Sequence, residues 1–129
     1  LAGFVGVNLL HGRSRGDGTV WLDASTAIAG LAQEPLTAGP ARAVFAPSAV
    51  SVFRDAPHGS PRNELPAAVA AIEDRWPVQR VWLDVAGQRI AADLTPSAVR
   101  DLGLATGHHV VAVVKATQVS LHLGGHSAP

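Results

Sequence analysis

Short stretches in which apolar and polar residues alternate dominate the chain, and a period of two is typical of half-buried strands. Many of these stretches are rich in Val and Ile, and the turn-forming pairs Asp17-Gly18 and Ala86-Gly87 lie between them. The pattern predicts strands at about residues 3–10, 18–23, 26–30, 41–46, 48–53, 78–85, 88–94, 108–115 and 117–122.

One helix is predicted by its end signals. Thr95 is a good N-cap, Pro96 suits the first helical position, and Gly103 suits the residue that ends a helix. Leu102 is expected to face inward, so the sequence predicts a short helix between Thr95 and Gly103.

The chain also carries a degenerate internal repeat. The segment 18–23, GTVWLD, returns as QRVWLD at 79–84, and the pattern of 44–53 returns at 113–122. Asn8-Leu9 is echoed by Asn63-Glu64-Leu65. Because the three echoes keep the same order along the chain, they indicate two copies of one unit.

The segment 65–76 is ambiguous when read alone. Its large apolar residues would share one face of a helix: Leu65, Val69, Ile72 and Trp76. A repeat unit built from strands instead requires a strand at about 67–74, so we expect a strand there.

Many short strands, several hairpins and one short helix predict an all-β fold. We expect two tandem five-stranded barrels of the oligonucleotide-binding (OB) type, with the helix in the second. The first unit is expected at 1–57, degenerate and sharing strands with the second; the second is expected at 58–124, before a disordered tail at 125–129. Since a barrel of about 60 residues buries little surface alone, the halves should share a core through Trp21 and Trp82.

Composition narrows the function classes. The 129 residues carry 10 basic and 10 acidic side chains, and this balance argues against nucleic acid, which requires a basic face. A few convergent donors can still hold a small anion. The chain has no Cys, which excludes disulfides and thiolate sites, and no apolar run long enough to span a bilayer. It also lacks Met at position 1, so we expect a piece of a longer protein.

Signatures of catalysis and of metal binding are missing from the sequence. There is no nucleophile elbow and no phosphate-binding glycine-rich loop with its lysine. Asp84 and Asp93 flank a predicted hairpin, where paired carboxylates are more often solvated strand ends. The six histidines show no ligand spacing with a carboxylate: His11, His58, His108, His109, His122 and His126. We therefore expect no enzyme activity, no metal and no cofactor.

Two clusters offer donors to an anion. Residues 59–63, Gly-Ser-Pro-Arg-Asn, place backbone N–H groups, the Ser60 hydroxyl and the Arg62 guanidinium in a short arc. Lys115, the only lysine, follows the apolar run 110–114. An ordinary polar turn and a lysine that reaches solvent from a strand end are the alternatives, and by spacing alone they are the commoner ones.

Five segments together resemble a known family: 4–10, 48–52, 59–63, 92–95 and 114–121. In this order the chain is similar to the C-terminal regulatory region of the ATP-binding subunit of a bacterial molybdate ABC importer. That region is built from molybdenum-pterin-binding-like (Mop or TOBE) modules. The resemblance covers about residues 3–122.

The resemblance implies a cytoplasmic sensor at the inner face of the membrane, which slows transport when molybdate or tungstate is plentiful. Its implied partners are a second copy of the domain, an upstream ATPase domain and a membrane permease. Each tetrahedral oxyanion would lie at a module or subunit interface. The implied ligand-binding residues are Ser60, Arg62, Asn63, Lys115, Ala116 and Thr117.

Two features depart from the family pattern. Pro61 removes a backbone donor from the first cluster, and the first half has Ala46 where the second has Lys115. The first half keeps Asn8 and Ser48 but has no Arg before the Asn. A soluble molybdate storage protein and a ligand-free dimerisation module are the alternatives to a transport regulator.

Overall fold

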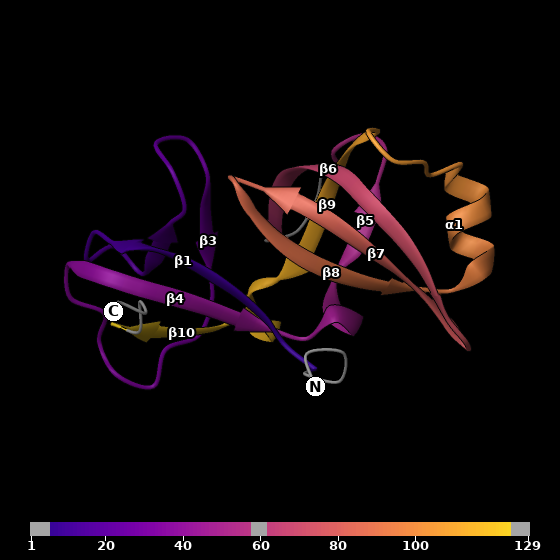
Figure 1. Cartoon of the computed structure of the whole chain (residues 1–129). Coiled ribbons are helices and arrows are strands. Elements are labelled where there is room, and N and C mark those ends of the chain that lie inside the picture. The colour runs from indigo at the N-terminus through magenta and orange to yellow at the C-terminus, as the bar shows by residue number, and fades with distance from the viewer. Residues whose placement is uncertain (1–5, 58–61, 125–129) are drawn as a thin grey trace.

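Two five-stranded sheets stand side by side in the computed structural model of this chain, which describes residues 6–57 and 62–124 (Figure 1). The expected tail at 125–129 lies outside the described residues. The first sheet contains β1 (Asn8–Ser14), β2 (Thr19–Trp21), β3 (Ala27–Ala29), β4 (Gly39–Phe45) and β10 (Ser120–Leu123). The second contains β5 (Ser51–Phe53), β6 (Arg62–Arg75), β7 (Val78–Val85), β8 (Gln88–Leu94) and β9 (His109–Lys115).

The two sheets have the same strand order. It is β10-β4-β1-β2-β3 in the first sheet and β5-β9-β6-β7-β8 in the second, with antiparallel ladders throughout. The repeat seen in the sequence is therefore a repeat of structure, and the all-β prediction with tandem OB-like units is confirmed. The helix α1 (Pro96–Leu102) lies beside the second sheet, at its outer edge.

The halves exchange their last strands. β5 comes from the first half of the chain and pairs with β9, whereas β10 comes from the second half and pairs with β4. The first sheet then closes on itself, because the Leu31 N–H donates to the Val119 carbonyl at 2.8 Å and the Leu121 N–H donates to the Leu31 carbonyl at 2.8 Å. Gly30 permits this crossing, since a Cβ there would lie 2.6 Å from the Val119 oxygen. The division at 57/58 stays a prediction; the sheets are assembled across it.

One aliphatic core runs through both sheets. It contains Leu10 and Ile28 from the first half and Leu65 and Leu83 from the second, all completely buried. The halves share a core, as the sequence analysis expects, but not through the tryptophans.

Trp21 and Trp82 are half-buried and lie outside this core, so the expectation that they join the halves is wrong. Their strand neighbours Val20 and Val81 are fully buried, and successive residues of a strand face opposite sides. Each indole therefore lies on the outer face, where Trp21 stacks under the Arg15 guanidinium at 3.9 Å.

The ambiguous segment 65–76 is a strand, as the repeat predicts. Leu65 and Val69 are buried at period two, and Trp76, which a helix would place beside them, is 82% exposed at the hairpin tip. A register shift between Val69 and Ala71 reverses the alternation, so that Ile72 packs against the core again. This bulge produces the spacing that imitates a helix.

Local turn signals give the remaining elements. The Thr95 hydroxyl accepts a hydrogen bond from the Ala98 N–H at 3.1 Å, and Gly103 ends α1 in the left-handed region, as predicted. Two predicted strands begin too early, because residues 47–49 and 116–118 form 3₁₀ turns, η2 (Pro47–Ala49) and η3 (Ala116–Gln118). In the described residues, no helix is long and apolar enough to cross a membrane.

Candidate functional site

Two asparagines hold the halves together in a reciprocal way. The Asn63 side chain accepts from the Ala29 N–H at 2.8 Å and donates to the Ala29 carbonyl at 2.9 Å. Asn8 does the same with the backbone of Ala91, at 2.8 and 2.9 Å. Both amides are buried, with 7% and 5% exposure. The echo of Asn8 in Asn63 therefore marks two equivalent clamps, one from each half of the chain.

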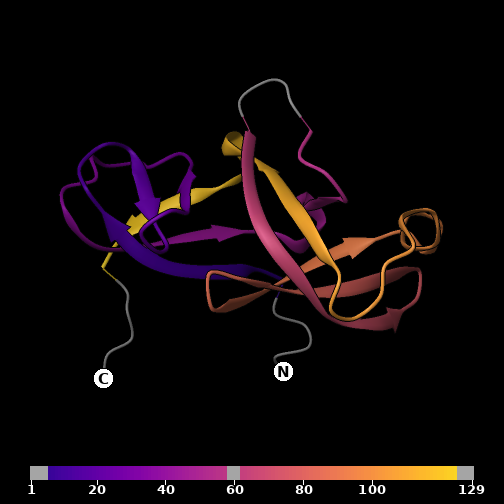
Figure 2. The same cartoon turned by 90° about the horizontal axis from the view of Figure 1, so that it is seen from above.

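The clamp at Asn63 fixes the start of β6 beside the end of β9. Arg62 is the register partner of Lys115, and Asn63 is the partner of Val114. The turn η3 follows Lys115 directly and lies close to the first residues of β6 (Figure 2). The structure thus brings Arg62, Asn63 and Lys115 together with Ala116 and Thr117. Ser60 lies outside the described residues, and the side chain of Arg62 is not described.

Lys115 is exposed and borders a groove of about 440 Å³. The groove runs between the two 3₁₀ turns and the strands attached to them. Its lining consists of Ser48, Ala49, Ser51, Val113, Lys115 and Gln118. The sequence points to Ser48 through its match to Thr117 in the repeat, as a residue by which the first half would contribute a hydroxyl to a shared site. Sequence reasoning missed Ser51 and Gln118.

The ammonium of Lys115 has no carboxylate partner in the described part of the chain, where the ion pairs all lie between residues 73 and 93. The strongest joins Arg80 to Asp93 through two bonds of 2.8 and 2.9 Å. The hydrogen bond with Asp93 raises the pKa of Arg80, the largest of several causes. Lys115 is therefore available to an external anion.

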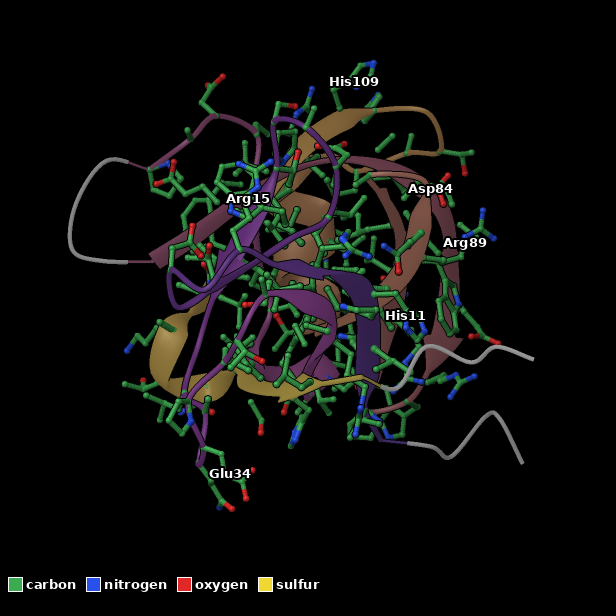
Figure 3. All side chains as sticks on the ribbon, turned by 90° about the vertical axis from the view of Figure 1, so that its left-hand side faces the viewer. His11, Arg15, Glu34, Asp84, Arg89 and His109 are labelled. Carbon is green, nitrogen blue, oxygen red and sulfur yellow. The ribbon has the colours of Figure 1, made fainter. Side chains whose placement is uncertain are left out.

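Asp84 and Asp93 do not converge. Asp84 is paired with Arg89 at 2.9 Å, and these two side chains lie together at one margin of the molecule (Figure 3). Asp93 is the register partner of Arg80, and only 18% of the Asp93 side chain is exposed. The two residues therefore form a half-buried ion pair, and Asp93 is not a solvated strand end. Each carboxylate therefore pairs with an arginine across the β7–β8 hairpin.

The described histidines do not gather into a metal site. His11 and His109 lie apart from one another in Figure 3, His11 half-buried and His109 exposed. Among residues 6–57 and 62–124, no three His, Asp or Glu side chains are grouped closely enough to hold a metal ion.

Comparisons with known proteins agree on one family. A family model described as the TOBE domain matches residues 59–121. The molybdenum import ATP-binding protein ModC of Mycobacterium tuberculosis is 37% identical over 97% of this chain. ModC of Brucella abortus is 47% identical over 54% of it. The chain spans about a third of the length of the mycobacterial protein, 35%.

A solved structure has the same fold over nearly the whole chain. It is the cytoplasmic molybdate-binding protein ModG with molybdate bound, and it covers 91% of this chain and 96% of its own. The TM-score is 0.77 at 24% sequence identity, a likeness that concerns the fold.

Proposed function

We propose that this chain, whose residues 59–121 match the TOBE domain family, is a non-catalytic regulatory domain. Its ligand is a tetrahedral oxyanion, molybdate or tungstate. Binding of this ligand lowers the activity of a molybdate ABC importer of which the chain is a part.

The observation that carries the proposal is the register of β6 and β9. Arg62 is the residue paired with Lys115 in the β6–β9 ladder, so the sequence places two cationic residues at one point of the sheet. Two like charges at such positions destabilise a sheet. A dianion between them removes this cost and gains charge-assisted hydrogen bonds, which are about twice as strong as neutral ones.

The residue types match a fully deprotonated anion. Arg62, Lys115 and the backbone N–H of Ala116 are donors only, and Ser60 and Thr117 carry hydroxyls that can donate. All four oxygens of molybdate accept at neutral pH, whereas phosphate keeps a proton and requires an acceptor. Asn63 belongs to the site as its support, because its amide holds Ala29.

The regulatory role follows from where the anion binds. A ligand held between modules or subunits can shift an equilibrium only by its different affinity for their two arrangements. The proposed partners of this domain are a second copy of the chain, an upstream ATPase domain and a membrane permease. The domain then acts at the cytoplasmic face and reports molybdate that has already entered. ModC relatives over 97% of the chain support this setting.

Calorimetric titration tests the ligand. Molybdate and tungstate, which share charge and nearly share size, should bind alike and more tightly than sulfate and phosphate. Sulfate is the critical control because it is equally deprotonated and differs only in size. Equal binding of sulfate and molybdate contradicts the proposal.

A separate experiment tests regulation. The full transporter is reconstituted with saturating substrate outside and graded molybdate on the ATPase side. ATP hydrolysis should fall as molybdate rises, and deletion of this domain should abolish the fall. Inhibition that survives the deletion, or hydrolysis that stays constant while the isolated chain binds molybdate, favours a storage protein instead.

A further inference from the structure

The 3₁₀ turns η2 and η3 are equivalent elements of the two halves. Asn8 pairs with Phe45 as Asn63 pairs with Val114, and Ser120 pairs with Val44 as Ser51 pairs with Val113. By this register, the residues from Ala46 to Ala49 correspond to those from Lys115 to Gln118. Each turn then closes with the same backbone bond, from Val50 to the Pro47 oxygen or from Val119 to the Ala116 oxygen.

Strand exchange places the first-half turn against the second-half lysine. Because β5 pairs with β9, η2 immediately before β5 borders the groove that Lys115 lines. Ser48 and Ser51 line that groove, whereas Thr117, the equivalent of Ser48, is exposed outside the lining. The hydroxyl beside Lys115 is therefore supplied by the other half of the chain.

The polar groups of this groove are not used by the fold. In the described part of the chain, the side chains of Ser48, Ser51, Lys115 and Gln118 make no hydrogen bond and no ion pair. Two hydroxyls, one ammonium and one amide can all turn N–H or O–H groups toward an anion. Hydrogen-bond donors without partners, gathered around one groove, suit a ligand that only accepts hydrogen bonds.

The corresponding position of the first half lacks these donors. Ala46 stands in place of Lys115, Val7 in place of Arg62, and Pro47, which has no backbone N–H, in place of Ala116. Val7 is 52% exposed and carries no polar atom in its side chain. The register-equivalent position of the first half therefore offers no cation to an anion.

We propose that each chain binds one oxyanion in a composite groove, in which the first half supplies the Ser48 hydroxyl and the second half supplies Lys115. Ser48, and not Thr117, is then the hydroxyl that contacts the anion. This inference rests on the proposed function and departs from the family pattern, which favours Thr117. It gives the first half a direct part in binding despite its missing cations.

Ser48→Ala and Thr117→Ala form a matched pair of variants. Both residues are exposed, both are the middle residue of a 3₁₀ turn, and neither side chain is bonded to another described residue. Each variant removes one hydroxyl and should leave the fold intact, as far-ultraviolet circular dichroism and thermal unfolding verify. Affinity for molybdate and tungstate is measured by calorimetry of the whole chain.

Ser48→Ala should weaken binding about ten- to a hundredfold, the range for one hydrogen bond to a charged group, and Thr117→Ala by less than twofold. The unmodified chain should bind one anion per chain. A loss from Thr117→Ala that equals or exceeds the loss from Ser48→Ala overturns the inference, as do two anions per chain. No binding by the unmodified chain overturns the proposed function itself.

Discussion

Asn8 and Asn63 make the same two hydrogen bonds, but their partners differ in exposure. Ala91, the partner of Asn8, is 2% exposed, and Ala29, the partner of Asn63, is half-buried, so water can reach its backbone. Removing either amide leaves one N–H and one carbonyl without a partner. The loss of folding free energy depends on whether water can hydrogen-bond to these two groups in place of the amide.

We therefore expect Asn8→Ala to lower the free energy of unfolding by about 2–4 kcal/mol, and Asn63→Ala by less. Urea denaturation of both variants measures the difference. Gln33→Ala, on an exposed loop, is the control and should change little. A larger loss of unfolding free energy from Asn63→Ala than from Asn8→Ala would show that the burial of Ala29 and Ala91 does not determine the effect.

Lys115 is the described residue on which the binding proposal depends most directly. Lys115→Ala should weaken molybdate binding by about 1.5–3 kcal/mol, the range for hydrogen bonds to charged groups. Stability should be nearly unchanged, because the side chain is exposed and has no ion pair in the described residues. Arg100→Ala, an exposed cation on α1, controls for net charge. Normal binding by Lys115→Ala would falsify the proposed site.

Among the elements, the β1–β2 turn depends on an ionised carboxylate. Asp17 accepts hydrogen bonds from the Thr19 hydroxyl and N–H and from the Trp21 indole, and the Thr19 hydroxyl is the largest cause of its lowered pKa. A lowered pKa means that the folded protein favours the charged form. This stabilisation is present above the ordinary carboxyl pKa of 3.8 and is lost as the pH falls through the lower pKa of the folded protein.

Asp17→Asn should therefore lower the melting temperature at pH 7, and the gap to the unmodified protein should close as the pH drops below about 4. Thermal melts at pH 7 and in acid measure the gap. Asp55→Asn, at an exposed carboxylate without a hydrogen bond to a described residue, is the control. A gap that is constant with pH would mean that the charge of Asp17 does not support the turn.

Elements with local signals are predictable from this sequence, and elements that depend on distant partners are not. Thr95, Pro96 and Gly103 specify α1 within one segment. The positive φ angles of Ala86 and Gly87 fit the turn predicted there. The start of β5 was missed because the 3₁₀ turn at Pro47 has the same apolar spacing as a strand.

The candidate site divides in the same way. Lys115 attracts notice as the only lysine of the chain and as a cation beside an apolar run, whereas its pairing with Arg62 is visible only in the register of the sheet. Ser48 gives no local signal, because its place in the groove results from pairing between β5 and β9, which are about sixty residues apart.

At the scale of the whole molecule, the shared core and the exchanged strands make the expected units 1–57 and 58–124 depend on one another. Either piece alone lacks one strand of its sheet and half of the core. We expect neither piece to unfold cooperatively by itself, and an equimolar mixture to regain the circular dichroism of the intact chain. Independent cooperative unfolding of 58–124 would establish it as a domain.

Dimerisation is the second expectation at this scale. The groove beside Lys115 is open, so a bound anion keeps oxygens that a second copy can contact. Light scattering should therefore give a two-fold dimer with molybdate present. A monomer at all molybdate concentrations would place the whole site within one chain.

The exchange of strands also determines the order in which the two sheets can form during synthesis. The edge of β4 that β10 fills is made early, whereas β10 ends at Leu123. Until those last residues leave the ribosome, β4 presents unpaired N–H and carbonyl groups, a surface that pairs readily with other chains. The nascent protein can complete its second sheet first, since β5 to β9 are all translated by Lys115. Closure of the first sheet thus follows completion of the second, and slow or interrupted translation of the codons for β10 leaves the edge of β4 open to aggregation.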